Sequence, residues 1–425
     1  MKDSGVEWIG AIPADWNLIP AKRVFRNEKR IVGAAVDNYE RLALTMNGVI
    51  KRSKDDSEGL QPEKFEGYQI LRKNELVFKL IDLENVKTSR VGLSPYTGLV
   101  SPAYIVLTNT QKNNRFYYYW FMFLYYNEVF NHLGGDGVRS ALNARDLLVL
   151  PVPNIAEKHQ IGISNYLEEK CAKIDEVIAR QQEAIEKLKA YKLSVITEAV
   201  TKGLNPDVPM KDSGVEWIGE IPLHWNNVRL KFLLTHLVDC PHETPMYSTD
   251  GDYLVIRTAD QDVAQLRADE DMFRLSETEY LRRIRRLPLE KDDIVYGREG
   301  GRWGLACRVP ESNRYCLGQR MLQFRCKTDV FDPYFATLAL SSQTIYLQGS
   351  VDTLGSASPH VNISTVQNYW IPLPPLNEQR KIVAIIGERC NEIEQQIMRK
   401  QVFIEKLVEY KKSLIYEVVT GKREV

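Results

Sequence analysis

Residues 211–219 read Lys-Asp-Ser-Gly-Val-Glu-Trp-Ile-Gly, and the same nine residues occupy positions 2–10. A long stretch with helical spacing of apolar residues precedes the second copy, from about 157 to 203. A closely similar stretch runs from 378 to the last residue. The chain therefore repeats one plan twice, and each copy consists of a short leader, a region of mixed composition and a long helix.

The two long stretches carry apolar residues at the 4-3 spacing of a heptad, and the second copy lies 219 residues after the first. Apolar a and d positions sustained over more than four heptads predict a coiled coil. The polar exceptions fall at the same two places in each copy, and polar residues in a seam usually fix its register. The predicted seam includes Leu167, Ile174, Ile178, Ile185, Leu188, Ile386, Ile393, Ile397, Ile404 and Leu407.

The alternation of globular region and helix allows the two helices to pair antiparallel, with pseudo-twofold symmetry. The sequence therefore predicts an α+β fold with two globular mixed α/β domains, separated by two long helices that pair as an antiparallel coiled coil. The expected domains are residues 1–154 and 204–376, and the expected helical segments are 155–203 and 377–425.

The two globular regions share an order of strand-like runs but little sequence identity, whereas the leaders and helices are nearly duplicated. This contrast indicates that the leaders and helices perform the same task in both copies, whereas the two globular regions have different binding specificities. Residues 117–130 are crowded with aromatic side chains, which predicts a buried helix. A platform on which nucleic-acid bases stack is the alternative interpretation.

Composition limits the classes of protein that fit. The formal net charge is zero, which argues against a strongly basic nucleic-acid binder, so DNA binding would depend on local patches. No run approaches 18 apolar residues, so we expect no membrane span. No signal segment precedes the first leader, and the six cysteines show no framework spacing. These features predict a cytoplasmic protein with free thiols.

No catalytic motif is evident. Residues 297–304 contain glycines but do not form a G-x-G-x-x-G turn between strand and helix. Asp332-Pro-Tyr lacks one proline of the Asp-Pro-Pro-Tyr motif of amino-methyltransferases. His236, Cys240 and His242 have spacing that a zinc site could use, but a loop with a buried cysteine is the simpler interpretation. We therefore expect no catalytic residue, no metal and no cofactor in this chain.

Short basic runs and polar loops are the candidates for DNA contact, with an ordinary solvated surface as the alternative. Runs at 51–54 and 282–286 would contact phosphates, while arginines and a histidine in loops would read bases. A Gly-rich loop at 134–137 carries two further candidates. The full set is Lys51, Arg52, Lys54, Arg139, Asn143, Arg282, Arg283, Arg285, Arg286, Arg298, Arg302, Arg320 and His360.

Two tryptophans lie in each leader, namely Trp8 and Trp16 in the first and Trp217 and Trp225 in the second. A buried turn is the simpler interpretation of either copy alone. Because the two copies are identical over nine residues, we interpret them as candidate docking segments that make the same contact with a partner twice.

With these motifs, the chain resembles the specificity (S) subunits of type I restriction–modification systems. The resemblance rests on the leader Asp-Ser-Gly-Val-Glu-Trp-Ile-Gly-x-Ile-Pro-x-x-Trp in both copies and on Ile-Pro-Leu-Pro-Pro-Leu-Asn-Glu-Gln-Arg-Lys-Ile at 371–382. It covers nearly the whole chain. The corresponding stretch of the first copy, 151–161, departs from the pattern because it lacks the Pro-Pro and Glu-Gln pairs.

The resemblance implies that each globular domain is a target recognition domain, which reads one half of a bipartite, asymmetric sequence in double-stranded DNA. It also implies that the coiled coil sets the spacer. It also implies two adenine-methylating modification subunits and two ATP-dependent restriction subunits as partners. S-adenosylmethionine, ATP and magnesium would then belong to those partners. The alternatives are a coiled-coil adaptor that holds two protein partners without touching DNA, and a self-sufficient nuclease or methyltransferase.

Overall fold

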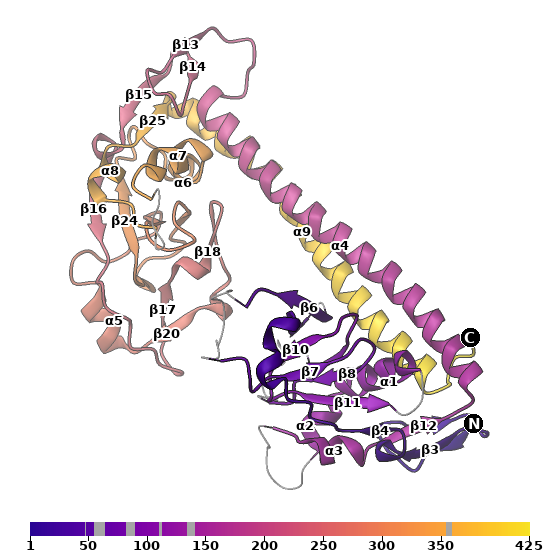
Figure 1. The fold of residues 1–425 in the computed structure, drawn as a ribbon. Helices are drawn as coiled ribbons and strands as arrows, with labels where there is room; N and C mark the ends of the chain where they lie inside the picture. Colours follow the sequence, from indigo (N-terminus) through magenta and orange to yellow (C-terminus); the bar gives the residue numbers. More distant parts are fainter. Residues whose placement is uncertain (47, 55–63, 82–89, 110–112, 134–140, 354–358) are drawn as a thin grey trace. The chain divides into compact units, whose positions relative to one another are not determined.

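The computed structural model describes all residues except 47, 55–63, 82–89, 110–112, 134–140 and 354–358. The chain divides into two compact units: Met1–Gln181 with Gln401–Val425, and Gln182–Lys400. Both units are mixed α/β, as the sequence predicted, and two long helices each contribute one end to each unit (Figure 1).

The first unit opens with a hairpin, continues with a strand that pairs with the last strand of its domain, and then forms two four-stranded sheets. The hairpin and the pair are β1 (Lys2–Asp3) with β2 (Ala11–Ile12), and β3 (Asn17–Pro20) with β12 (Pro151–Asn154). One sheet has the order β6 (Gly48–Arg52), β5 (Arg41–Thr45), β10 (Gly98–Val100), β7 (Gln69–Leu71). The other has the order β4 (Phe25–Arg26), β11 (Ile105–Asn109), β8 (Leu76–Phe78), β9 (Val91–Leu93).

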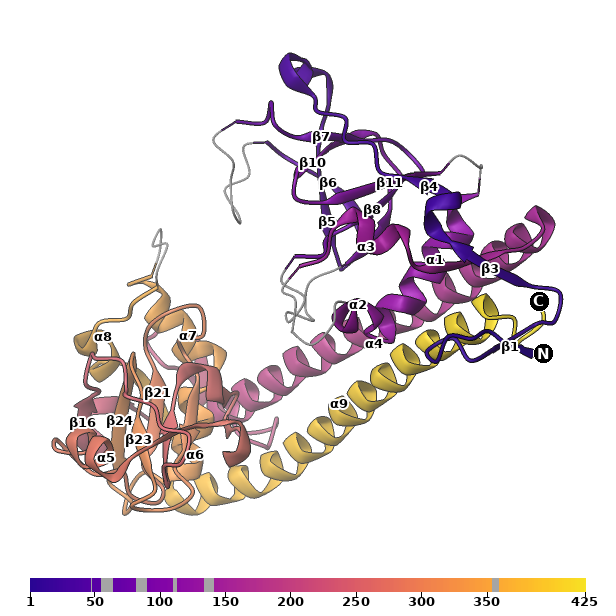
Figure 2. The ribbon, with the colours of Figure 1, turned by 90° about the horizontal axis from the view of Figure 1, so that it is seen from below.

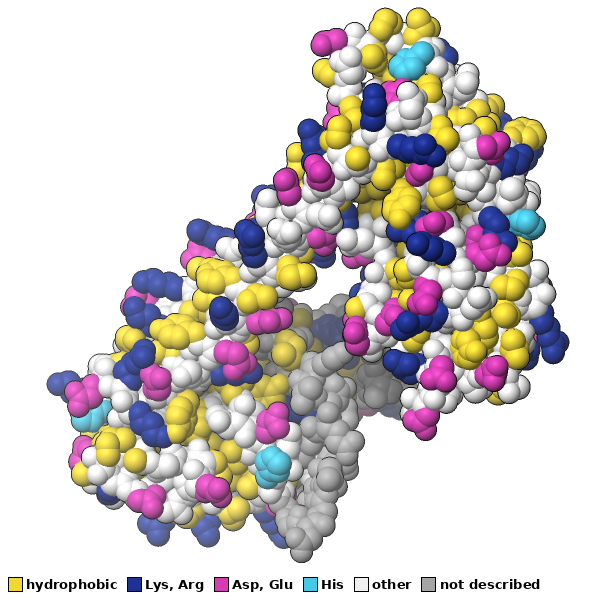
Figure 3. Space-filling view, turned by 180° about the vertical axis from the view of Figure 1, so that it is seen from behind, with side chains coloured by type: hydrophobic (Ala, Val, Ile, Leu, Met, Phe, Trp, Pro, Cys, Tyr) yellow, Lys and Arg dark blue, Asp and Glu magenta, His cyan; other side chains and the backbone are white. Residues whose placement is uncertain are grey.

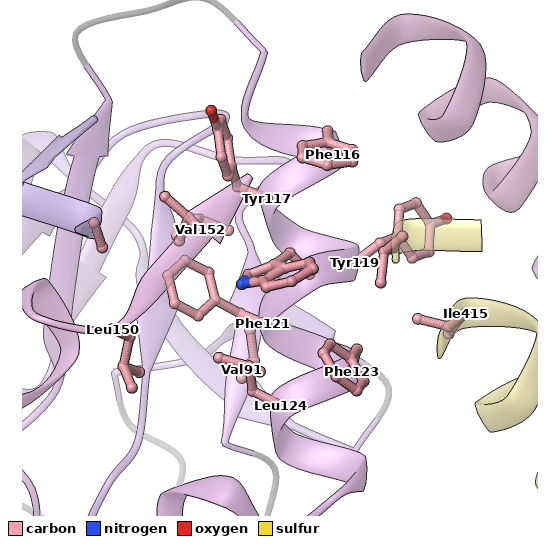
Figure 4. Close-up of a cluster of buried hydrophobic side chains, with 14 of the residues drawn as sticks. Val91, Phe116, Tyr117, Tyr119, Phe121, Phe123, Leu124, Leu150, Val152 and Ile415 are labelled. Carbon is pink, nitrogen blue, oxygen red and sulfur yellow. The ribbon is translucent and has the colours of Figure 1, made fainter. Parts of the chain in front are cut away.

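The helices of this domain are α1 (Asn114–Tyr126), α2 (Val129–His132) and α3 (Ala144–Leu148). The aromatic side chains of α1 fill the core: Trp120 and Phe121 are fully buried, and the cluster includes Ile415 from the second long helix (Figure 4). The prediction of a buried helix is therefore confirmed, and these two rings have no free face on which a base could stack.

The second unit repeats this layout. Its hairpin is β13 (Met210–Asp212) with β14 (Glu220–Pro222), and its closing pair is β15 (Asn226–Arg229) with β25 (Trp370–Leu373). One sheet has the order β16 (Leu234–Asp239), β24 (Met321–Cys326), β21 (Ile294–Gly297), β22 (Ala306–Arg308). A three-stranded sheet has the order β20 (Phe273–Leu275), β17 (Tyr253–Ile256), β23 (Tyr315–Leu317). A two-stranded sheet pairs β18 (Gln261–Asp262) with β19 (Gln265–Leu266). Its short helices are α5 (Glu277–Arg283), α6 (Pro333–Leu340), α7 (Gln343–Ser350) and α8 (Ile363–Gln367).

The two domains share a topology that their sequences conceal. The only parallel strand pair described in each domain joins corresponding strands, β5 with β10 in the first and β17 with β23 in the second. Just before β8 and β21, Asn74 (φ 65°) and Asp292 (φ 73°) adopt left-handed backbone conformations. Asn and Asp tolerate this conformation better than other residues with a Cβ, so the same turn persists in both copies.

The long helices are α4 (Glu157–Lys202), with 46 residues, and α9 (Leu376–Val419), with 44. A glycine with positive φ follows each helix, Gly203 at 77° and Gly421 at 70°, as is common at helix C-termini. The buried Trp225 packs close to Gly203, and the buried Trp16 packs close to Gly421. Each leader therefore covers the end of a long helix within its own unit.

Within each unit the ends of α4 and α9 run antiparallel (Figure 2). None of the ten predicted seam residues is exposed: six are buried, and Ile178, Leu188, Ile404 and Leu407 are partly buried. Both helices begin over a buried glutamine, Gln160 or Gln379, whose side-chain amide donates to a backbone carbonyl. Gln160 thus takes the place of the glutamine that the first copy seemed to lack.

Candidate nucleic-acid interface

One edge of the second domain gathers half of the predicted DNA-binding residues of that domain, and three others, Arg282, Arg283 and Arg286, contact this edge. The sheet order places the end of β16 beside the start of β24, and the start of β24 beside the end of β21. The loops that follow β16 and β21 and the turn that precedes β24 therefore meet there. We call residues 239–244, 298–304, 318–320 and His360 the arginine edge.

Arg298 holds the arginine edge together from inside. Its side chain is only 4% exposed, and its Nη2 lies 3.2 Å from Asp239 Oδ2 and 3.1 Å from Glu299 Oε1. Its Nη1 lies 2.9 Å from His360 Nε2 and donates to the carbonyl of Val361. These contacts occupy the N–H groups of the guanidinium. Arg298 therefore orders the loops, and its guanidinium is not available to DNA. The prediction that Arg298 reads bases is revised accordingly.

Arg283 is also buried, with no exposed side-chain surface. Its guanidinium donates to four backbone carbonyls, those of Leu317, Gly318, Glu243 and Pro241, at 3.0–3.4 Å. It therefore joins the loop after β16 to the turn before β24. The prediction that Arg283 contacts phosphate is wrong for this geometry, because its charge faces the interior of the protein.

Arg282 is partly exposed but is engaged by two carboxylates. Hydrogen bonds to Glu279 and Glu243 raise the pKa of the Arg282 guanidinium. The same bonds, with Arg282 as the main cause, lower the pKa of both carboxyl groups below their usual range. Two carboxylates thus neutralise the start of the basic run, and its available charge lies further along the chain.

The remaining arginines of this group are exposed. Arg285 makes no hydrogen bond or ion pair in the described part of the chain, and Arg286 donates to the carbonyl of Asp239. Arg302 donates to the carbonyls of Thr258 and Gln261.

Arg320 lies in the turn before β24 with φ 68°, and its guanidinium has no partner in the described residues. One Nη of Arg320 would lie 3.4 Å from a Cβ at Gly300, so a glycine gives it room. Of the candidates, Arg320 is the best placed for base readout because its fork is free and its turn is fixed by the hydrogen bond from Arg298 N to Arg320 O.

The first domain presents its candidates on another sheet. Lys51 and Arg52 lie on the edge strand β6, and Lys54 follows it; they line a hollow of about 520 Å³ with residues 37–41. Lys51 Nζ lies 2.6 Å from Glu40, whose hydrogen bond raises the pKa of Lys51, and Lys54 donates to the carbonyl of Val36. Lys51 is exposed, Arg52 and Lys54 are partly exposed, and the charge of the group is partly balanced.

Two further candidates follow the Gly-rich loop of the first domain. Arg139 lies outside the described residues. The side chain of Asn143 accepts hydrogen bonds from the backbone N–H groups of Arg145 and Asp146 and so caps α3. This local role accounts for Asn143 without DNA.

The leader tryptophans fall into two classes. Trp16 and Trp225 are 7% and 0% exposed and pack at the helix ends, so they are not available to a partner. Trp217 is 39% exposed, and Trp8 is partly buried near Phe123. Only Trp8 and Trp217 therefore remain as docking candidates.

The carboxylates of the arginine edge escaped the sequence analysis. Asp239 and Glu299 engage Arg298, and they also lie within 3.2 Å of His242 and His360, respectively. The adjacency of Glu299 to Arg298 was visible in the sequence, but nothing local connects Asp239 to a residue 59 positions later.

The cysteines behave as interior residues. All six are buried and free, and burial raises the pKa of the Cys307 and Cys326 thiols to about 12. Cys240 accepts a hydrogen bond from the backbone N–H of Met321. Within the described ranges, no group of three or more His, Cys, Asp or Glu side chains is arranged to hold a metal ion.

Charges of both signs are interspersed over the surface in Figure 3, without one basic block. No helix in the described part of the chain has the length and apolar character needed to span a membrane.

Comparison with known proteins gives consistent similarities. A family described as "Type I restriction modification DNA specificity domain" matches residues 244–400. A putative type I restriction enzyme MjaX specificity subunit of Methanocaldococcus jannaschii is 22% identical, over 98% of this chain and 96% of the relative. The MjaVIII specificity subunit of the same organism is 26% identical over 65% of this chain, and the match spans 62% of that relative.

The same fold occurs in a solved chain from work on complex assembly and conformational transition of the type I R-M system. That chain is 14% identical, with a TM-score of 0.64 over 96% of this chain and 98% of the other. At this identity the similarity concerns the fold alone.

Proposed function

The chain belongs to the specificity subunits of type I restriction–modification systems, and we propose that it supplies DNA sequence recognition to such a complex. The observation that carries the proposal is the duplicated plan, in which two domains of one topology and different sequence are each joined to an end of a helix pair. Each domain reads one half of a bipartite target, and the helix pair sets the spacer.

The arginine edge supports a DNA-reading role for the second domain. Arg298 and Arg283 hold its loops from inside, while Arg285 and Arg320 present free guanidinium groups. A guanidinium presented from a fixed turn, as in Arg320, matches the N7 and O6 acceptors of guanine, and a second exposed arginine can contact the phosphate backbone. The neutral net charge fits this role if other subunits of the complex supply part of the DNA clamp.

The proposal places the catalytic chemistry on partner subunits. Two modification subunits would use S-adenosylmethionine to methylate adenine, and two restriction subunits would use ATP and magnesium. The exposed faces of the two leaders, which include Trp8 and Trp217, are the proposed docking surfaces for the modification subunits. Because its DNA target lies in the bacterial or archaeal cytoplasm, the chain would act there.

The adaptor interpretation is less favoured. It accounts for the repeated leaders and helices, but it gives no reason for two diverged domains or for an ordered arginine edge. The family match over residues 244–400 covers most of the second domain and favours DNA recognition.

The test is a map of DNA methylation. The chain is co-expressed with its modification subunit in a host without adenine methylation, and N6-methyladenine is mapped by single-molecule sequencing. We expect one bipartite motif with two short half-sites and a fixed gap. A stable complex that methylates DNA without such a motif, or does not methylate it, would favour the adaptor role.

Arg320→Ala should relax one base position in one half-site. Loss of one bidentate contact lowers discrimination by about 1–3 kcal/mol, and Arg320→Lys should do nearly the same because lysine lacks the planar fork. The measurement is the methylation rate on duplexes that vary one base at a time. A uniform loss on all duplexes with Arg320→Ala, which Arg320→Lys reverses, would instead assign the residue to phosphate.

A further inference from the structure

Two lysines occupy seam positions of the long helices where the heptad calls for apolar side chains. They are Lys192 in α4 and Lys411 in α9, which lie 219 residues apart and therefore correspond in the internal repeat. A lysine in a seam weakens apolar packing, so its presence at the same place in both copies needs a reason.

In the second unit, Lys192 Nζ lies 2.6 Å from Glu394 Oε1. The lysine side chain is only 4% exposed and the glutamate side chain 32%. Lys192 also lines a cavity of about 330 Å³ with Cys390, whose pKa is raised by burial although the nearby lysine opposes the shift. A buried ammonium group needs a partner, and Glu394 is the carboxylate that supplies one.

In the first unit, Lys411 Nζ lies 2.7 Å from both carboxylate oxygens of Asp175. This pair is more open, with the lysine side chain 21% exposed and the aspartate side chain 56%. Lys411 stands near Cys171, which corresponds to Cys390 in the repeat. The first unit therefore contains the same arrangement as the second.

The two pairs correspond to each other in the internal repeat. A shift of 219 residues converts Lys192 into Lys411 and Asp175 into Glu394, so each lysine pairs with the carboxylate of the other copy. Both pairs have the same register. Sliding one helix by a heptad would place Lys192 opposite Gly387 or Gln401, and in neither case would both lysines face a carboxylate.

We propose that the Lys192–Glu394 and Lys411–Asp175 pairs are positioning pairs that fix the register of α4 and α9. The apolar seam holds the helices together but distinguishes poorly between neighbouring registers, whereas a charged seam residue favours the register in which it meets its partner, most strongly where it is buried, as Lys192 is. Through this register the pairs define the spacing at which the two domains read their half-sites, an inference that rests on the proposed function.

The experiment replaces both pairs by apolar residues in the full chain, with Lys192→Met, Glu394→Met, Lys411→Met and Asp175→Leu. Buried ion pairs such as Lys192–Glu394 can often be replaced in this way without loss of stability, and a more exposed pair such as Lys411–Asp175 contributes little to stability. The purified complex with modification subunits is assayed on duplexes whose spacer is natural, three base pairs longer or three shorter, because one heptad of about 10 Å corresponds to about three base pairs. Relative methylation of the altered spacers should rise by about tenfold, because polar seam residues specify register.

The matched control removes the exposed Glu183–Lys187 pair of α4, with both side chains changed to Met, and should leave spacer preference unchanged. Unchanged spacer preference in the fourfold variant would overturn the proposal. If that variant does not fold, Lys192→Glu is compared with Lys192→Glu/Glu394→Lys. The double exchange must restore the spacer preference that the single change impairs, and failure to restore it overturns the proposal. A wild-type complex without a bipartite motif would instead overturn the proposed function.

Discussion

Arg283→Ala is expected to destabilise the second unit by about 3–5 kcal/mol, the range measured when one partner of a buried charged pair is removed. The arginine side chain is fully buried beside the equally buried Glu279, at 3.7 Å. Its loss would leave four backbone carbonyls without this donor and a buried carboxylate held only by Arg282 and the backbone of Met246 among the described residues. The measurement is the free energy of unfolding of the full chain in urea, with hydrogen exchange to locate the loss.

The control is Arg285→Ala, two positions further along the same basic run. Arg285 is exposed and has no partner in the described structure, so its removal should change stability by no more than about 0.5 kcal/mol. We expect it instead to weaken binding to all DNA sequences alike and to reduce the salt dependence of binding by about one unit. Equal stability of the two variants would contradict the structural role of Arg283.

The contrast between these arginines shows where prediction from sequence ends. Four arginines in five residues indicate a basic surface, but the partners of Arg283 lie up to 42 residues away along the chain. No local pattern specifies which guanidinium turns inward. The same holds for Arg298, whose carboxylate partner Asp239 belongs to another strand.

The long helices could be predicted well because their signal is local and repeated. Apolar residues at heptad spacing define one face of a helix whatever surrounds it, and the second copy confirms the pattern of the first. The topology of the domains could not be read in this way. The positions of strands as short as β8 and β21 are determined by pairing with distant strands, and the sequences of these strands have diverged between the copies.

Trp225→Ala is expected to have the second large effect, a loss of about 3–5 kcal/mol, because a fully buried indole leaves a large cavity. Trp225 is 0% exposed and packs over Gly203, where α4 ends. The change therefore removes the cover of this helix end and should loosen the second leader. Thermal unfolding of the full chain, followed by circular dichroism, measures the effect. A midpoint close to that of the wild type would contradict this role.

Trp217→Ala provides the matched comparison within the same leader. Since its indole is 39% exposed, the loss of stability should be on the order of 1 kcal/mol. If the repeated leader docks the modification subunit, the affinity for that subunit should fall by at least about 2 kcal/mol, as for a tryptophan hot spot. Trp8→Ala should weaken the second docking event in the same way, because the surrounding nine residues are identical. Unchanged affinity in the double variant Trp8→Ala/Trp217→Ala would exclude the leaders as docking surfaces. The duplication of the leaders would then be explained by the helix ends that Trp16 and Trp225 cover.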